Sequence, residues 1–223
     1  MKYLTLGRRI LSALAVFCGS FAFATDYYVS TTGSDENDGL SSETAVATID
    51  KAISLATTKN DTIHVAPGTY QTSTQWGPNL LATMVGTGTS RDEVVIESSG
   101  AYRTLRMAAD SVVRHLTLVG NKDYKADKGG AVEMSGGLLE DCVIKDGTAN
   151  ASNSIEGGNI YLNGGTIRKC LITGGKAKRR GGNVYQENGT VENCKIRDGY
   201  SENVAANLYF VKGLVTKCTI ADG

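Results

Sequence analysis

Gly-Gly-Asn-Ile-Tyr at residues 157–161 returns as Gly-Gly-Asn-Val-Tyr at 181–185 and as Ala-Ala-Asn-Leu-Tyr at 205–209. The copies begin 24 residues apart, so both the residue types and the spacing repeat. A fixed period of this length is typical of a solenoid, in which each turn buries its apolar face only against its neighbours. The pattern therefore predicts a stack of similar coils.

A second motif follows the same period. Gly-Thr-Ile-Arg-Lys-Cys at 165–170 becomes Gly-Thr-Val-Glu-Asn-Cys at 189–194 and Gly-Leu-Val-Thr-Lys-Cys at 213–218. The two motifs keep a constant distance from each other along the chain, so each belongs to the same structural unit. One motif alone would mark a turn; the pair marks a whole coil.

The coil centred on Tyr185 shows which side chains point inward. The residues equivalent to Val184, Val191, Cys194 and Ile196 in the other coils are apolar, so we place these four side chains inside the coil. Side chains alternate across a strand, so Tyr185 points outward. Three short strands and three turns in each coil of about 24 residues predict an all-β, right-handed parallel β-helix.

The first 24 residues have the composition of a secretory signal peptide. Three basic residues lie within the first nine positions, an apolar stretch covers 10–21, and Ala-Phe-Ala at 22–24 fits a cleavage site. The apolar stretch is too short for a membrane span. We therefore expect residues 1–24 to be removed, and the chain to be secreted, periplasmic or on the outer surface of a bacterium.

The rest of the chain divides into a cap and a solenoid. We assign residues 25–60 to an N-terminal cap of one strand, a loop and a short amphipathic helix near 47–56, with Thr48 as its N-cap. Residues 61–223 form the β-helix. The last residues repeat the middle of a coil and no closing segment follows, so we expect the β-helix to be incomplete at its C-terminus.

The N-terminal part resembles a known superfamily. The stretches that carry the resemblance are Tyr-Tyr-Val-Ser at 27–30, Ala-Thr-Ile-Asp-Lys-Ala-Ile at 47–53, Asp-Thr-Ile-His-Val at 61–65 and Gly-Thr-Tyr at 68–70. With the coils, they are similar to the capping region and solenoid of secreted pectate-lyase-like parallel β-helix proteins. The resemblance implies the fold, but the superfamily includes lyases, hydrolases and adhesins, so it implies no single activity.

The bulk composition excludes some classes of partner. The chain has 23 basic and 23 acidic residues, so no net charge attracts nucleic acid or an anionic membrane. Its 27 glycines, two prolines and 41% hydrophobic residues fit one ordered β domain. No apolar stretch after residue 24 approaches the length of a membrane span.

A column of tyrosines next to a basic run is the strongest sign of a binding site. Tyr161, Tyr185 and Tyr209 project from one outer face, where an aromatic ladder could pack against sugar rings. The run Lys176, Lys178, Arg179 and Arg180 precedes the Tyr185 strand and could pair with uronate carboxylates. These seven residues form the candidate carbohydrate-binding site. The alternatives are self-stacking tyrosines and a solvated basic loop.

Two further columns favour structural roles. Cys142, Cys170, Cys194 and Cys218 either form disulfides between coils or stack as free thiols, and the apolar Leu116 in the same column favours the stack. A parallel column contains Asn159, Asn183 and Asn207. Stacked asparagine amides can form a hydrogen-bonded ladder between coils.

Catalytic residues and metal ligands remain unassigned from the sequence. The two histidines, His64 and His115, have no nearby nucleophile. Asp141, Asp146 and Glu156 could share a face with the basic run, but the sequence does not place them there. The acidic loop at 35–39 could bind calcium, although it lacks the distal glutamate of a full calcium loop. We expect no other cofactor.

The combined expectation is an exported β-helix module that binds a polysaccharide or serves as a structural, adhesin-like passenger. The alternative is a pectate-lyase-like polysaccharide lyase or glycoside hydrolase that acts on an acidic polysaccharide. Clustered carboxylates beside a basic group would favour the enzyme.

Overall fold

The computed structural model describes most of the chain after the expected signal peptide. The described residues are 24–74, 77–100, 102–123, 128–150 and 156–223. The signal peptide predicted at 1–24 lies outside them except for Ala24, so it stays a prediction. Among the described residues, no helix has the length and apolar character to cross a membrane.

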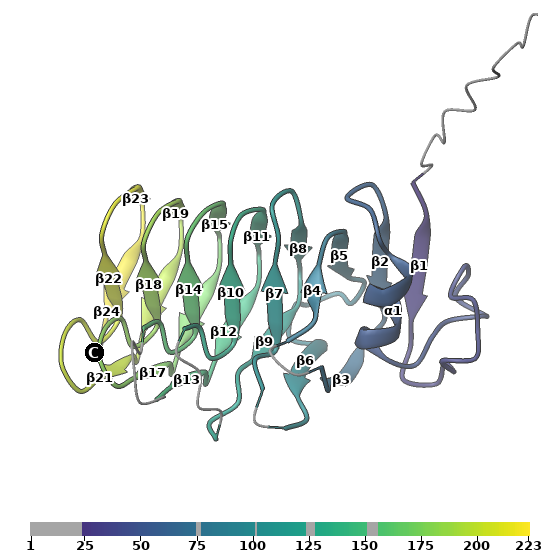
Figure 1. The fold of residues 1–223 in the computed structure, drawn as a ribbon, viewed down its shortest axis with the longest axis horizontal. Helices are drawn as coiled ribbons and strands as arrows, with labels where there is room; N and C mark the ends of the chain where they lie inside the picture. Colours follow the sequence, from purple (N-terminus) through teal and green to yellow (C-terminus); the bar gives the residue numbers. More distant parts are fainter. Residues whose placement is uncertain (1–23, 75–76, 101, 124–127, 151–155) are drawn as a thin grey trace, which may run out of the picture.

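Three parallel sheets run along the molecule, and successive coils add their strands to them in turn (Figure 1). The largest contains β1 (Asp26–Val29), β2 (Thr62–Val65), β5 (Thr83–Gly86), β8 (Val112–Arg114), β11 (Leu138–Glu140), β15 (Thr166–Arg168), β19 (Thr190–Glu192) and β23 (Leu214–Thr216). The second contains β3 (Gly68–Thr72), β6 (Val94–Ser98), β9 (Thr117–Val119), β12 (Val143–Lys145), β16 (Leu171–Thr173), β20 (Lys195–Arg197) and β24 (Thr219–Ala221).

The third sheet contains β4 (Asn79–Leu80), β7 (Leu105–Met107), β10 (Val132–Met134), β14 (Ile160–Leu162), β18 (Val184–Gln186) and β22 (Leu208–Phe210). A fourth, short sheet of β13 (Thr148–Ala149), β17 (Lys176–Ala177) and β21 (Tyr200–Ser201) was not expected from the sequence. It adds a fourth side to the later coils. The predicted right-handed parallel β-helix is confirmed.

The register confirms the predicted period. Val184 pairs with Leu208, 24 residues further on, and Val132 pairs with Ile160, 28 residues further on. The coils therefore vary around about 26 residues, and the last ones keep a constant length of 24 residues. Strand β1, which we assigned to the cap, pairs in register with β2 and is the first strand of the largest sheet.

The N-terminal cap contains the predicted helix. Helix α1 spans Ile49–Leu55, and the Thr48 hydroxyl accepts a hydrogen bond from the Lys51 backbone N–H. Ile49 and Ala52 are fully buried and join the core. The amphipathic pattern therefore directs one face of α1 onto the first coil, where it covers apolar side chains that the coil alone would expose.

The lumen of the β-helix is apolar. Val184, Val191, Cys194 and Ile196 are at most 1% exposed, as the alternation predicted. Asn193 turns the chain between two sheets with a φ of 51°, a conformation that asparagine adopts at low cost. The inward and outward assignments of this coil are confirmed.

A ladder of asparagines ties the later coils together. Asn159 Nδ2 donates to Asn183 Oδ1 over 2.8 Å, and Asn183 Nδ2 donates to Asn207 Oδ1 over 2.7 Å. The glycines before Asn159 and Asn183 are needed for close stacking: a Cβ on Gly182 would lie 2.1 Å from the carbonyl oxygen of Ala206. The repeated Gly-Asn pair thus encodes the tight spacing of these coils.

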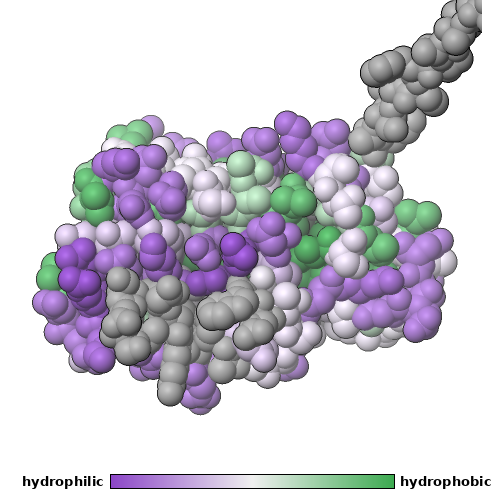
Figure 2. All heavy atoms as spheres, in the orientation of Figure 1, coloured by the Kyte–Doolittle hydropathy of each residue, from purple (hydrophilic) through white to green (hydrophobic). Residues whose placement is uncertain are grey.

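Hydrophobic and hydrophilic residues occupy different stretches of the surface along the length of the molecule (Figure 2). On the face seen in Figure 2, hydrophobic residues gather beside the N-terminal coils and at the C-terminal end, with hydrophilic residues between them. The last coil exposes Phe210, Val211, Leu214 and Ile220, each to between 46% and 52%. The prediction that the β-helix is incomplete at this end stays a prediction.

Candidate functional site

The tyrosine column lies on an outer face but does not offer its rings to solvent. Tyr161 and Tyr185 are only 4% and 7% exposed, so the expectation that they form an open ladder is wrong. The ring centroids of Tyr161 and Tyr185 lie 5.4 Å apart at an interplanar angle of 4°, and those of Tyr185 and Tyr209 lie 5.3 Å apart at 8°. The ring faces are turned along the solenoid axis and cover one another.

Charged groups lie close to the first and the last ring of this stack. Lys128 Nζ lies 4.4 Å from the centre of the Tyr161 ring and 3.1 Å from its hydroxyl, which also contacts Glu187. The guanidinium of Arg180 lies 5.0 Å from the centre of the Tyr209 ring. A sugar ring would have to displace Lys128 to reach the Tyr161 face that Tyr185 leaves uncovered. The column is therefore built as a self-stacking support of the sheet.

The basic run is split between two surroundings. Lys176 begins the short strand β17 and is exposed, as are Lys178 and Arg179. Arg180 is half-buried and forms an ion pair of 3.5 Å with Glu156, which is 8% exposed. The segment that we expected to be a loop is thus partly a strand. Arg180 packs beside the tyrosine column, whereas Lys176 lines a groove on another side of the molecule.

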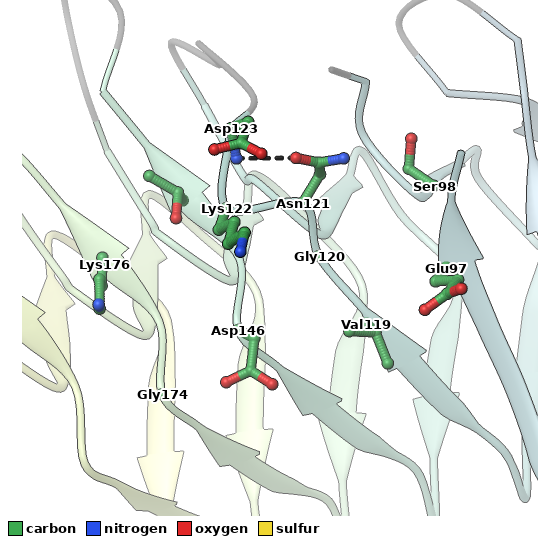
Figure 3. A pocket seen from close by; sticks show the side chains of 11 residues that line it. Glu97, Ser98, Val119, Gly120, Asn121, Lys122, Asp123, Asp146, Gly174 and Lys176 are labelled. Atoms are coloured by element: carbon green, nitrogen blue, oxygen red, sulfur yellow. Dashed lines mark hydrogen bonds between the residues drawn. The ribbon is translucent and has the colours of Figure 1, made fainter. Parts of the chain in front are cut away.

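This groove is lined mainly by polar side chains (Figure 3). It has a volume of about 480 Å³ and follows the corner where the second sheet meets the short fourth sheet. Its polar lining includes Glu97, Lys122, Asp123, Asp146, Thr148 and Lys176. Figure 3 shows Glu97 and Lys176 on opposite sides, with Lys122 and Asp146 between them.

The chain turns sharply where these side chains leave the backbone. Asp146 follows β12 with a φ of 60°, and Gly174 follows β16 one coil later with a φ of 69°. A Cβ on Gly174 would lie 2.6 Å from an Asp146 carboxylate oxygen, so the glycine leaves room for this side chain. The left-handed turn at the end of each strand therefore directs Asp146 over the next coil and into the groove.

Several charged groups of the groove lack partners within the described part of the chain. The carboxylates of Asp123 and Asp146 and the ammonium groups of Lys122 and Lys176 form no hydrogen bond or ion pair with described residues. Glu97 accepts one hydrogen bond, from Gln71 over 3.3 Å. Exposed, unpaired donors and acceptors that converge on one groove are available to a polar ligand.

Tyr200 extends this surface by one coil. It pairs with Lys176, which pairs with Thr148, so the three side chains form one column on the short fourth sheet. Tyr200 is 57% exposed and stacks on no described ring. Sequence reasoning missed it because it lies outside the Asn-x-Tyr motif. Its only signal was its position after Asp198-Gly199, where Lys176 follows Gly174-Gly175.

The other acidic candidates lie apart from the groove. Asp141 accepts from His115 Nδ1 over 2.7 Å and forms an ion pair of 3.3 Å with Arg91, at the bend between two sheets. Glu156 pairs with Arg180 beside the tyrosine stack. Of the three carboxylates considered from the sequence, only Asp146 joins Lys176 in one groove.

The acidic loop at 35–39 uses its carboxylates internally. Asp35 accepts hydrogen bonds from the Ala47 and Thr48 backbone N–H groups and from the Thr48 hydroxyl, which lowers the pKa of its carboxyl despite some desolvation. Asp38 binds the Leu40 N–H and a threonine hydroxyl. Within the described ranges, no cluster of three or more His, Cys, Asp or Glu side chains could hold a metal ion.

The cysteine column has the form of the thiol stack. Cys142, Cys170, Cys194 and Cys218 are free, and the first three are buried. Burial raises the pKa of the Cys170 and Cys218 thiols, and the contact with Cys170 raises that of Cys194. High thiol pKa values leave little reactive thiolate at neutral pH. The column therefore belongs to the core.

Comparison with known proteins gives limited information. A family described as a protein of unknown function (DUF1565) matches residues 31–84, which include α1 and β2 to part of β5. A solved structure of a rhamnogalacturonan lyase is similar with a TM-score of 0.49 and 14% identity, over 83% of this chain and 62% of that one. The chain thus spans less than two thirds of that protein. No curated protein matches.

The strand order and register carry the fold assignment. Successive coils pair parallel and in order from β1 to β24, so the chain has the parallel β-helix fold that the sequence predicted. A fold shared by enzymes and binding proteins does not define an activity. The chemistry must be inferred from the groove itself.

Proposed function

We propose that this chain is an exported β-helix module that binds a neutral, hydroxyl-rich polysaccharide in the groove between Glu97 and Tyr200. The observation that carries the proposal is the set of carboxylates and ammonium groups around one hollow of about 480 Å³, most of which have no partner among the described residues. Carboxylates accept hydrogen bonds from neighbouring sugar hydroxyls, and lysines donate to the sugar oxygens.

The charge of the groove favours a neutral chain over a polyuronate. The lining includes three carboxylates, Glu97, Asp123 and Asp146, against two ammonium groups, Lys122 and Lys176. A polyuronate would bring its own negative charges close to the carboxylates, and like charges in a partly enclosed groove repel. This changes our sequence-based expectation that the basic run pairs with uronate carboxylates in favour of a neutral glycan.

The length of the surface suits an extended oligosaccharide. Glu97 lies on β6, and Tyr200 lies four coils later, so the surface measures about 19 Å at the usual spacing of parallel strands. The exposed Tyr200 ring offers an apolar face to the apolar side of a sugar, which the buried Tyr185 cannot do. A linear glycan would lie along the solenoid axis, across successive coils.

Binding measurements on variants test the proposal. A panel of neutral and uronate-containing oligosaccharides is screened with the full chain, and the best ligand is measured by calorimetry. Tyr200→Ala and Lys176→Ala should each weaken binding about tenfold, which corresponds to about 1.4 kcal/mol. Tyr185→Phe, which keeps the stacked ring, should bind normally. Preference for polyuronates, or unchanged binding by both groove variants, would contradict the proposal.

Cleavage of the bound glycan is the second candidate function. A lyase or hydrolase needs a proton donor and a proton acceptor beside the bond that it breaks. The observation in favour of this function is that one groove contains both carboxylates and ammonium groups that have no partner among the described residues. Incubation of the chain with polysaccharides, with and without calcium, followed by detection of unsaturated or newly reducing ends, tests it. Loss of any product formation in Asp146→Asn would assign cleavage to the groove.

A further inference from the structure

A second cleft lies at the N-terminal coil, remote from the groove. It has a volume of about 350 Å³ and is bounded by β1, β2 and the segment at 42–45 that precedes α1. Val29 and Ala45, which are 1% and 3% exposed, belong to its apolar lining, and Ala66 adds a half-buried methyl group. Its polar lining consists of His64 and the hydroxyl side chains Tyr28, Ser30, Ser42 and Thr87.

The hydrogen bond to Asp26 fixes the tautomer of His64. His64 Nε2 lies 2.8 Å from Asp26 Oδ1, and an ionised carboxylate can only accept, so Nε2 carries the proton. In the neutral imidazole, Nδ1 is then an acceptor. No described residue donates to Nδ1. His64 is one of the residues that line the cleft, and its side chain is 29% exposed.

The ring of His64 is held in place on its other side as well. Tyr28 stacks on it with ring centroids 5.0 Å apart and an interplanar angle of 19°. The two residues are paired in register on β1 and β2, so the backbone sets this geometry. The stacked tyrosine and the carboxylate together fix the direction in which Nδ1 points. Histidines that bind a ligand are commonly oriented by a hydrogen-bond partner on their other nitrogen in the same way.

We propose that this cleft binds a phenolic group, meaning an aromatic ring that carries an acidic hydroxyl. The ring would lie against Ala45 and Ala66, and its hydroxyl would donate to His64 Nδ1. The apolar lining favours a ring over a sugar, whose many hydroxyls would lose water without finding partners. A carboxylate does not fit, because it has no proton to give and would approach Asp26.

An NMR titration of the full chain with two matched probes tests this proposal. p-Cresol carries the hydroxyl, and 4-methylanisole has the same ring with the hydroxyl methylated. At about pH 8 an ordinary imidazole is neutral and a phenol is protonated. p-Cresol should shift the signals of His64, Val29 and Ala45 and bind about fivefold tighter than 4-methylanisole, the order of one net hydrogen bond.

Two variants make the test decisive. His64→Phe keeps a ring that can stack on Tyr28 but lacks the acceptor, so both probes should bind it equally. Ser42→Trp fills the cleft from its exposed rim, so binding of both probes should be lost. The proposal is overturned if the probes bind wild type equally, if the preference survives His64→Phe, or if p-cresol shifts other regions or nothing.

Discussion

Replacing Tyr185 by alanine should destabilise the fold without acting directly on a binding site. Tyr185 lies in the middle of the tyrosine column, is 7% exposed and stacks on Tyr161 and Tyr209. Its removal interrupts both stacks at once and leaves a gap on the outer face of the third sheet. A change at Tyr161 or Tyr209 would remove only one of the two ring pairs.

The size of the effect follows from these contacts. Each aromatic pair contributes about 0.5–1.5 kcal/mol beyond the area that it buries, so two pairs contribute about 1–3 kcal/mol. Truncation of a large buried aromatic costs about 3–5 kcal/mol in a closed core, but Tyr185 lies outside the lumen, where the gap can be filled by solvent. We therefore expect Tyr185→Ala to lower the free energy of unfolding by about 2–4 kcal/mol.

Urea unfolding followed by circular dichroism measures this quantity. Tyr200→Ala is the matched control, because Tyr200 is 57% exposed and unstacked, and it should change the free energy of unfolding by less than about 0.5 kcal/mol. Tyr185→Phe keeps the ring and should cost little. A Tyr185→Ala variant that is as stable as wild type but no longer binds glycan would refute the structural role of the column.

Three further predictions concern stability and reactivity. Asn183→Ala removes four hydrogen bonds of the asparagine ladder and should lower the free energy of unfolding by about 2–4 kcal/mol in urea titrations. Asn163 is exposed, so Asn163→Ala should lower it by less than about 0.5 kcal/mol. Similar losses in the two variants would contradict the role of the ladder. The hydrogen bonds from Arg168 lower the pKa of the Glu140 carboxyl in the folded protein. The ionised carboxylate therefore stabilises the fold fully at pH values above the unfolded pKa of about 4.3, and less as the pH falls below it. The difference in the free energy of unfolding between wild type and Glu140→Gln should shrink between about pH 5 and pH 3, and a constant difference would argue against this role. Cys218 is half-buried and its thiol has a raised pKa, so mass spectrometry should show that Cys218 is alkylated slowly, but earlier than the three cysteines inside the lumen. Earlier alkylation of a lumen cysteine would mean that the stack opens.

The fold was predictable because the repeat carries its own register. Equivalents of Val184 and Ile196 recur at a fixed period, and a shift by one residue would expose every apolar side chain. Helix α1 was predictable from the spacing of Ile49 and Ala52 and from the Thr48 cap. The short fourth sheet was not, because two-residue strands such as β17 have no periodicity to detect.

The site was harder to predict because it depends on side-chain direction and on distant segments. The spacing of Tyr161 and Tyr185 correctly placed both on an outer face, but it said nothing about ring orientation, and parallel stacking turns the faces away from solvent. The groove joins Glu97, Asp146 and Lys176, which come from different coils and lie at turns of unequal length. Without the coil lengths, their positions along the axis are undetermined.

Hydrogen–deuterium exchange of the full chain with and without its best neutral oligosaccharide tests the central claim most directly. The ligand should slow exchange in peptides that cover residues 119–123, Asp146 to Ala149, and β17 with β21, because these segments line the groove and its extension to Tyr200. Peptides that cover β14, β18 and β22, which carry the tyrosine column, should exchange at unchanged rates. Protection confined to the tyrosine strands would contradict the account.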